Sequence, residues 1–192
     1  MKKLVFQMKK LNEISLLEES KMAKVQTYFL LFLAGSIIGW FYELFFYWIF
    51  ENRISNNGFF FGPYLPIYGF GTLFIVMLTK NLKKHPIAIF FLSIPITGIL
   101  EYVTGYAMYE IWATRWWDYR TAFWNLDGYV CIRSVLSFAV GAILLIYLVE
   151  PLICMLSNKM GKRNRSAFCI GVILIFMIDI IATILFRMPA FA

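Results

Sequence analysis

Among the ionisable side chains within the long apolar stretches of the sequence, we single out four as best placed to do chemistry. They are Glu43, Glu101, Arg133 and Asp179. A charged side chain at the centre of a membrane-spanning helix costs about 2.5–3.5 kcal/mol on insertion scales, so such a residue is by default a functional candidate. The carboxylates could bind a cation, an amine or a proton, and the guanidinium could set their charge.

The same four residues are predicted to lie at a similar depth in a membrane. Each is about four to nine residues from the outer end of its apolar stretch, and a rise of 1.5 Å per residue then places all four in the outer leaflet. On the first stretch, the residues that share a face with Glu43 are Ser36, Gly39, Trp40 and Tyr47. Small and polar residues of membrane helices face other helices rather than lipid, so we expect the charges to point inward.

Two interpretations of this charged layer remain open. The first is a ligand or ion site that opens to the outer face. The second is a structural network in which Arg133 pairs with Glu43 or Glu101, while the remaining carboxylates are protonated and hydrogen-bonded.

A segment rich in glycine and proline, GFFFGPYLPIYGFG at 58–71, interrupts the second apolar stretch near its outer end. Irregular backbone at membrane depth is tolerated only where it is buried or lines a wet cavity. Pro63 or Pro66 suits the first turn of a helix, whose N-terminus would point at the carboxylates and could orient one of them or an anionic ligand. A plain tight turn before a short helix is the alternative. The candidate ligand-binding aromatic residues here and on the first stretch are Trp40, Tyr64 and Tyr68.

A second aromatic segment, WATRWWDYRTAFWN at 112–125, contains four tryptophans. It is too aromatic for a free loop, and we expect it either to anchor in the membrane interface or to fold over the pocket as a lid. Aromatic faces beside arginine can hold cationic or sugar-like ligands. The candidate ligand-binding residues in this segment are Arg115, Trp117 and Asp118.

Membrane helices must position these residues, and the sequence predicts an all-α integral membrane protein with five transmembrane helices. Of the 192 residues, 61% are hydrophobic and 15% are charged, whereas soluble domains have roughly 25% charged residues. Runs of about 20 apolar residues are long enough to cross a bilayer. The predicted spans are 26–50, 63–79, 86–110, 130–156 and 167–187, the second being short and broken.

The distribution of positive charge predicts how the spans are oriented. Thirteen of the 18 Lys and Arg residues lie before the first span or in the loops after the second and fourth spans. Positive residues are enriched in cytoplasmic loops, so the N-terminus is predicted inside and the C-terminus outside. Residues 1–25 then form a basic cytoplasmic segment, either an interfacial amphipathic helix or a loose tail, ahead of a membrane domain over 26–192.

Several function classes find no support in the sequence. The net charge of +7 needs only an anionic lipid surface as its partner, so we expect no nucleic acid. There is no GxxxxGK[ST] run, so the chain is not itself an ATPase, and there is no HExxH. Cys131, Cys154 and Cys169 have no metal-ligand spacing, and the one histidine is His85, in a predicted loop. We expect no metal and no cofactor.

Five motifs, taken in order, resemble a known family. They are WFYE at 40–43, GPYLPIYGFG at 62–71, LEYVTG at 100–105, RWWDY at 115–119 and NLDGYVCIR at 125–133. Together, over about residues 27–150, they are similar to the putative ABC-transporter type IV family of bacterial membrane proteins. Tyr129 stands where that family usually has arginine. The resemblance implies a permease-like, multi-pass protein of a bacterial plasma membrane.

Three functional hypotheses follow. The first is a small transporter or permease-like subunit with an outward-facing polar pocket, working as a homo-oligomer or beside a separate ATPase or other partner subunit. The second is an intramembrane enzyme that acts on a lipid or lipid-linked head group at the outer leaflet, with two carboxylates as general acid and base. The third is a non-catalytic accessory or sensor protein. The first is preferred, so the chain is not expected to be an enzyme, and its ligand would be a small molecule, an ion or a lipid head group.

Overall fold

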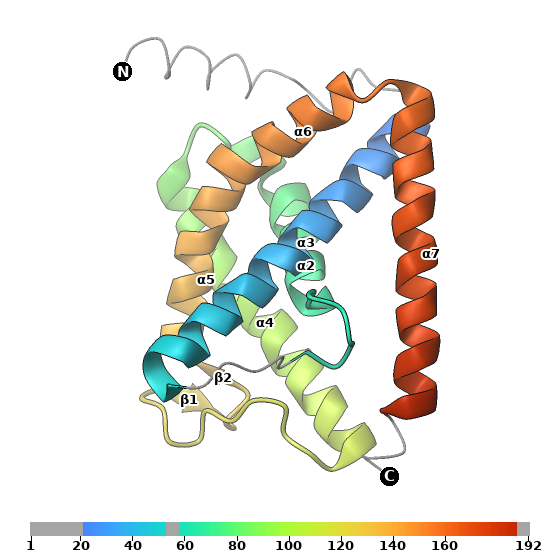
Figure 1. Ribbon diagram of the computed structural model, residues 1–192. Helices are drawn as coiled ribbons and strands as arrows, with labels where there is room; N and C mark the ends of the chain where they lie inside the picture. The colour runs from blue at the N-terminus through green and yellow to red at the C-terminus, as the bar shows by residue number, and fades with distance from the viewer. Residues whose placement is uncertain (1–20, 53–57, 188–192) are drawn as a thin grey trace. The chain divides into compact units, whose positions relative to one another are not determined.

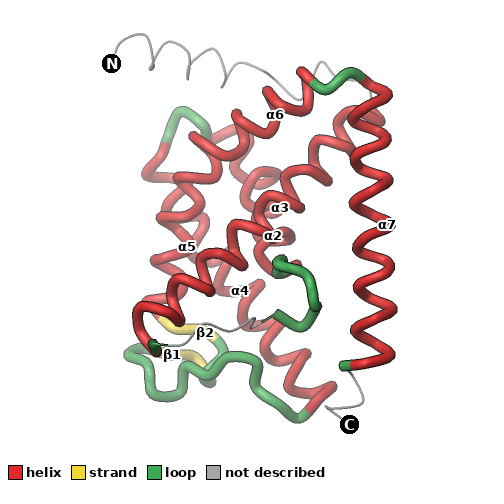
Figure 2. The backbone as a smooth tube through the Cα atoms, in the orientation of Figure 1, coloured by secondary structure: helices red, strands yellow, loops and turns green. Residues whose placement is uncertain are grey.

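The computed structural model describes residues 21–52 and 58–187, so most of the predicted N-terminal segment lies outside the described residues. This part of the chain is almost entirely helical (Figures 1 and 2). It contains four helices that are long and apolar enough to cross a membrane: Lys21–Ile49, Pro86–Trp112, Ile132–Lys159 and Lys162–Phe186. The chain divides into two compact units, which we call unit 1 (Met1–Phe70 with Tyr147–Ala192) and unit 2 (Gly71–Ile146).

Unit 1 is built around α2 (Lys21–Glu51), which contacts both α6 (Glu150–Lys159) and α7 (Lys162–Phe186). Figure 1 shows α2 in blue and α7 in red. The sequence of α2 contains no proline, so no backbone N–H is missing from the interior of the helix, which suits a lipid environment. The helix ends where Asn52 takes a left-handed conformation with φ of 50°, which suits asparagine at a helix C-terminus.

Two glycines let α2 and the following segment approach closely. A Cβ atom on Gly39 would overlap the Tyr68 ring, and one on Gly69 would overlap Ser36. The backbone N–H of Leu65 donates a 3.0 Å hydrogen bond to the carbonyl of Ser36. Small residues at these positions therefore allow backbone contact between α2 and the start of the next helix.

That next helix, α3, runs from Pro66 to Thr79 and is followed by a short 3-10 turn, Lys80–Leu82. It begins at one of the two prolines predicted to start a helix, because the fixed φ of proline suits the first helical position. Its 14 residues extend about 21 Å, less than the roughly 30 Å of a bilayer core. For this reason α3, which occupies the second predicted span, is not among the four long helices.

Unit 2 contains the later part of α3, the 3-10 turn, and α4 (Pro86–Trp112) packed along α5 (Ile132–Leu144). A short hairpin lies between α4 and α5 in sequence. Strands β1 (Asn125–Leu126) and β2 (Val130–Cys131) pair antiparallel, with Asn125 opposite Cys131. The buried face of α4 is largely polar and recurs every four residues: Ile89, Ser93, Thr97, Glu101 and Gly105. The inward orientation predicted for Glu101 agrees with this face.

Prolines modify two of the membrane helices. Pro95 lies inside α4 and removes one helical hydrogen bond, while the hydroxyls of Ser93 and Thr97 donate to carbonyls one turn earlier. A π-helical turn, Leu145–Val149, joins α5 to α6, where Pro151 lies in the first turn. Such turns accommodate a residue that cannot continue the regular hydrogen-bond ladder.

Candidate functional site

The carboxylate of Asp179, on α7, binds the segment that precedes α3. It accepts hydrogen bonds from the backbone N–H groups of Phe61 (3.0 Å) and Gly62 (2.9 Å) and from the hydroxyl of Tyr64 (2.5 Å). Thr183, one turn later on α7, donates a longer bond of 3.4 Å. Asp179 therefore anchors the glycine- and proline-rich segment to α7 within unit 1.

Arg187 binds the same segment from the end of α7. Its Nη1 atom donates to three successive carbonyls, those of Gly58, Phe59 and Phe60, each at 2.8 Å. The guanidinium also lies 5.3 Å from the centre of the Phe61 ring, within range of a cation–π contact. Residues 58–62 thus bind Arg187 through their carbonyls and Asp179 through their amides. These two charged residues lie about two turns apart along α7.

Glu43, on α2, has a sparser polar environment. The hydroxyl of Tyr68 donates a 3.0 Å hydrogen bond to its Oε1 atom, and among the described residues this is its one hydrogen bond. The Tyr68 ring is fixed by the close approach of Gly39 and lies 6.2 Å from the ring of Tyr42. Trp40, also predicted for this site, packs edge-on against Phe41 with ring centres 5.1 Å apart.

Glu101 and Arg133, both in unit 2, are in different environments. Glu101 is only 4% exposed, and its Oε2 atom lies 2.8 Å from the hydroxyl of Ser134, which is also 2.8 Å from the carbonyl of Cys131. Arg133 is the neighbour of Ser134 in the chain, yet its side chain is exposed. The structure thus brings the hydroxyl of Ser134, at the start of α5, to the buried carboxylate.

The predicted charged layer is divided between the two units. Glu43 and Asp179 belong to unit 1, and Glu101 and Arg133 belong to unit 2. Each carboxylate accepts a hydrogen bond from a hydroxyl group far from it in the sequence. The donors are Tyr68 for Glu43, Tyr64 for Asp179 and Ser134 for Glu101. The two predicted tyrosines are thus brought to predicted carboxylates, Tyr68 to Glu43 and Tyr64 to Asp179.

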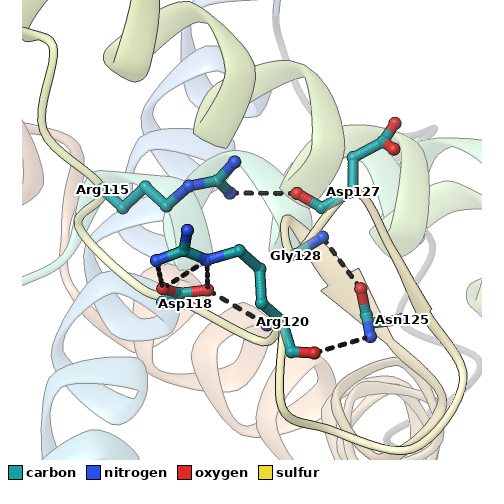
Figure 3. Close-up of polar contacts among 6 residues, drawn as sticks. All are labelled: Arg115, Asp118, Arg120, Asn125, Asp127 and Gly128. Atoms are coloured by element: carbon teal, nitrogen blue, oxygen red, sulfur yellow. Dashed lines mark hydrogen bonds and ion pairs between the residues drawn. The ribbon is translucent and has the colours of Figure 1, made fainter.

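The aromatic segment before the hairpin is tied together by its own polar contacts (Figure 3). Arg115 donates to the carbonyl of Asp127 at 3.0 Å, and its guanidinium lies 4.3 Å from the centre of the Tyr129 ring. Trp117 donates from its indole nitrogen to the carbonyl of Tyr129 at 2.8 Å. The ring of Tyr129 therefore stacks with an arginine from elsewhere in the segment.

Asp118 is engaged by Arg120 two residues later, as Figure 3 shows. The guanidinium binds both carboxylate oxygens, at distances down to 2.6 Å, and the backbone N–H of Arg120 adds a third donor. These hydrogen bonds lower the pKa of Asp118 from its ordinary 3.8 to about 2. Asp118 was predicted as a ligand-binding residue. In the structure it forms an ion pair with Arg120 of the same loop.

A buried polar network at the other end of unit 1 was missed by the sequence prediction. Arg165 of α7 is 7% exposed; it donates to Gln26 Oε1 at 3.0 Å and to the carbonyl and hydroxyl of Ser157 at 3.1 Å. Ser157 in turn lies 2.7 Å from the hydroxyl of Thr27. The predicted loop after the fourth span includes Arg165, because the distribution of charge along a sequence does not distinguish a residue in a loop from one in the first turn of a helix.

Glu150 is a second ionisable residue that the prediction passed over. It is 2% exposed at the start of α6 and lies inside the predicted span 130–156. A search for every Asp or Glu within a predicted span would have identified it. Among the described residues, no group of three or more His, Cys, Asp or Glu side chains could hold a metal ion.

Comparisons with known proteins give one match. A family model described as "Putative ABC-transporter type IV" matches residues 30–184. No curated protein and no solved structure matches the chain. The matched range includes most of α2, the whole of α3 to α6, and nearly all of α7.

Proposed function

Since the chain belongs to the putative ABC-transporter type IV family, we propose that it is the permease-like membrane subunit of a transporter, working beside a separate ATPase or as a homo-oligomer. Its apolar helices and its family support a multi-pass, transporter-like membrane protein. The chain has no phosphate-binding loop motif of its own, so ATP hydrolysis would come from another subunit.

The ligand that we propose is a small cation, an amine or a proton, held by the carboxylate of Glu43. The observation that carries this proposal is the contrast between Glu43 and Asp179, the two carboxylates of the predicted charged layer that belong to unit 1. Asp179 accepts four hydrogen bonds, two of them from backbone amides. Glu43 accepts one, from the neutral hydroxyl of Tyr68. A carboxylate in a membrane helix with so little support needs a proton or a positively charged ligand.

Glu101 of unit 2 is the second carboxylate that we assign to ligand or proton binding. Its burial on a membrane helix and its contact with the hydroxyl of Ser134 support this role. Asp179 would set the charge in unit 1, which holds Glu43, and Arg133 would do so in unit 2, which holds Glu101. The aromatic segment at 112–125 would cover the outer end of unit 2.

We further propose that α3 completes a fifth crossing, with the N-terminus cytoplasmic and the C-terminus outside the plasma membrane. The support is the alternation of charge, 13 Lys and Arg residues on one side against 5 on the other. The glutamates would then lie in the outer half of the membrane, and the site of each would open outward.

The test is the charge displaced when a cation is applied to the protein in liposomes on a solid-supported membrane. Ammonium, methylammonium and choline are each applied at constant pH, and a pH step is applied separately. We expect at least one of these steps to give a transient current that Glu43→Gln abolishes. The matched control is Glu110→Gln, which neutralises an exposed carboxylate at the end of α4 and should leave the current unchanged. No current with any probe, or an equal current in Glu43→Gln, would contradict the proposal.

A further inference from the structure

Unit 2 contains a groove that the proposed function does not use. It is an open groove between the middle of α4, the hairpin and the start of α5, and its volume is about 890 Å³. Most of its lining is apolar, for example Ile94, Ile99, Val103, Leu126, Val130 and Val135. Such walls bind a hydrocarbon chain and offer little to a polar ligand.

The position of the groove points to a lipid. The α4 wall belongs to a helix able to cross a membrane, and Ile99 and Val103 are 65% and 58% exposed, so lipid chains are their surroundings. At the hairpin end, the rings of Phe123 and Trp124 stack 5.7 Å apart and are 75% and 73% exposed. Exposed aromatic residues of this kind lie at the level of lipid head groups. The groove therefore runs from hydrocarbon to the head-group region.

The polar end of the groove carries a negative charge. Tyr102, which lines the groove, donates a 2.9 Å hydrogen bond to the carboxylate of Asp127. Arg115 binds the backbone carbonyl of Asp127, and Figure 3 shows the Asp127 carboxylate pointing away from that guanidinium. The acid is thus exposed at the rim, and it complements a positively charged group.

The backbone that presents this carboxylate is unusual. Trp124 and Asp127 both adopt left-handed conformations, with φ of 49° and 52°, which non-glycine residues rarely do. The turn is held by the Arg115 bond and by the N–H of Gly128, which donates to the side chain of Asn125 at 3.0 Å. Strained backbone that its surroundings hold in place is often found at ligand sites.

We propose that unit 2 binds an amine-headed membrane lipid, with one acyl chain in the groove and the ammonium group of the head at Asp127. The site is separate from Glu43, and it stands or falls independently of the proposed transport function. The acyl chain supplies affinity through apolar contact with the groove. The carboxylate of Asp127 supplies selectivity for a head group that carries an amine.

The test uses the full chain in nanodiscs with trace amounts of two photoactivatable lipids. Both carry the same diazirine-labelled acyl chain, one on phosphatidylethanolamine and the other on phosphatidylglycerol. We expect the ethanolamine probe to label peptides of the groove about fivefold more than the glycerol probe, as one exposed ion pair would provide. Equal labelling by the two probes would overturn the proposal.

Two matched pairs of variants locate the site. Ile99→Trp fills the groove, while Ile87→Trp makes the same change on a 73% exposed residue outside it; only the first should abolish the labelling. Asp127→Asn keeps a residue that tolerates left-handed backbone and should reduce ethanolamine labelling to the glycerol level, whereas Asp118→Asn should not. Equal labelling in the two tryptophan variants would mean that only bulk lipid is being sampled, and would refute the site. Size-exclusion profiles check that each variant is folded.

Discussion

Tyr64 donates a 2.5 Å hydrogen bond to Asp179, although the two residues are 115 positions apart in the chain. The tyrosine ring also stacks on Phe176, one helical turn before Asp179, with ring centres 4.4 Å apart. One polar and one apolar contact therefore fix the segment before α3 onto α7. We interpret Asp179 as an anchor for this segment, and we keep Glu43 as the proposed ligand-binding carboxylate.

Removing the anchor should loosen unit 1. Asp179→Asn replaces one acceptor oxygen by a donor that faces other donors, and we expect a loss of about 1–3 kcal/mol of stability. Tyr64→Phe removes one bond but keeps the ring stack, and should cost about 0.6 kcal/mol, the average for hydrogen bonds in membrane proteins. Thermal unfolding in detergent measures both, with Tyr106→Phe, an exposed tyrosine, as control. A melting temperature of Asp179→Asn equal to that of the wild type would contradict the interpretation of Asp179 as an anchor.

The contact between α2 and Tyr68 makes Gly39 sensitive to substitution. A Cβ atom there overlaps the tyrosine ring, whereas one on Gly171 of α7 meets nothing within 4 Å. Gly39→Ala should cost about 1–3 kcal/mol through overpacking, and should disturb the bond from Tyr68 to Glu43. Gly171→Ala, the same change on another membrane helix, should be neutral or slightly stabilising. Equal stabilities of the two variants would show that α2 and Tyr68 are not in close contact.

The buried network around Arg165 should contribute more to the stability of the protein than the exposed side chain of Arg163 does. Arg165→Gln removes charge-assisted bonds to Gln26 and Ser157, each worth about 1.5–3 kcal/mol. Arg163→Gln removes the same charge from an exposed position in the same turn of α7 and should change stability by less than about 0.5 kcal/mol. Chemical denaturation of the two variants side by side measures the difference, and no difference would mean that the network is not stabilising.

The membrane class and the four long helices could be predicted from the sequence because bilayer thickness fixes the length of an apolar span. The predicted spans 86–110 and 130–156 lie within a few residues of Pro86–Trp112 and Ile132–Lys159. Helical periodicity also predicted that Glu101 lies on the inward face of its helix. It could not identify Ser134 as its neighbour, because apolar lipid and apolar helix surfaces give little information on which helices pack together. Contacts such as Arg115 with Tyr129 depend on loop turns for which the sequence has no periodic signal.

The loop pair of Asp118 and Arg120 should be insensitive to pH over the usual working range. Its hydrogen bonds to Arg120 lower the pKa of Asp118 from 3.8 to about 2. A lowered carboxyl pKa means that the pair stabilises the loop fully above about pH 4, and that this contribution is lost as the pH falls toward 2. Tryptophan fluorescence of the loop, followed from pH 7 to pH 2, should be constant until the last part of this range. Asp118→Asn should remove the late transition, and a transition near pH 4 in the wild type would show that the pair does not form.

The most direct test of the ligand-binding role of Glu43 is modification by dicyclohexylcarbodiimide. This apolar reagent takes the proton of a carboxylic acid within the membrane, and the carboxylate then adds to its central carbon. We expect mass spectrometry to find Glu43 modified and Asp179, with its four hydrogen bonds, unmodified. The cation that gives a current in liposomes should protect Glu43 from modification in a concentration-dependent way. Modification of Asp179 in place of Glu43, or labelling of Glu43 that neither a cation nor a rise in pH reduces, would contradict the assignment of Glu43 as the ligand-binding carboxylate.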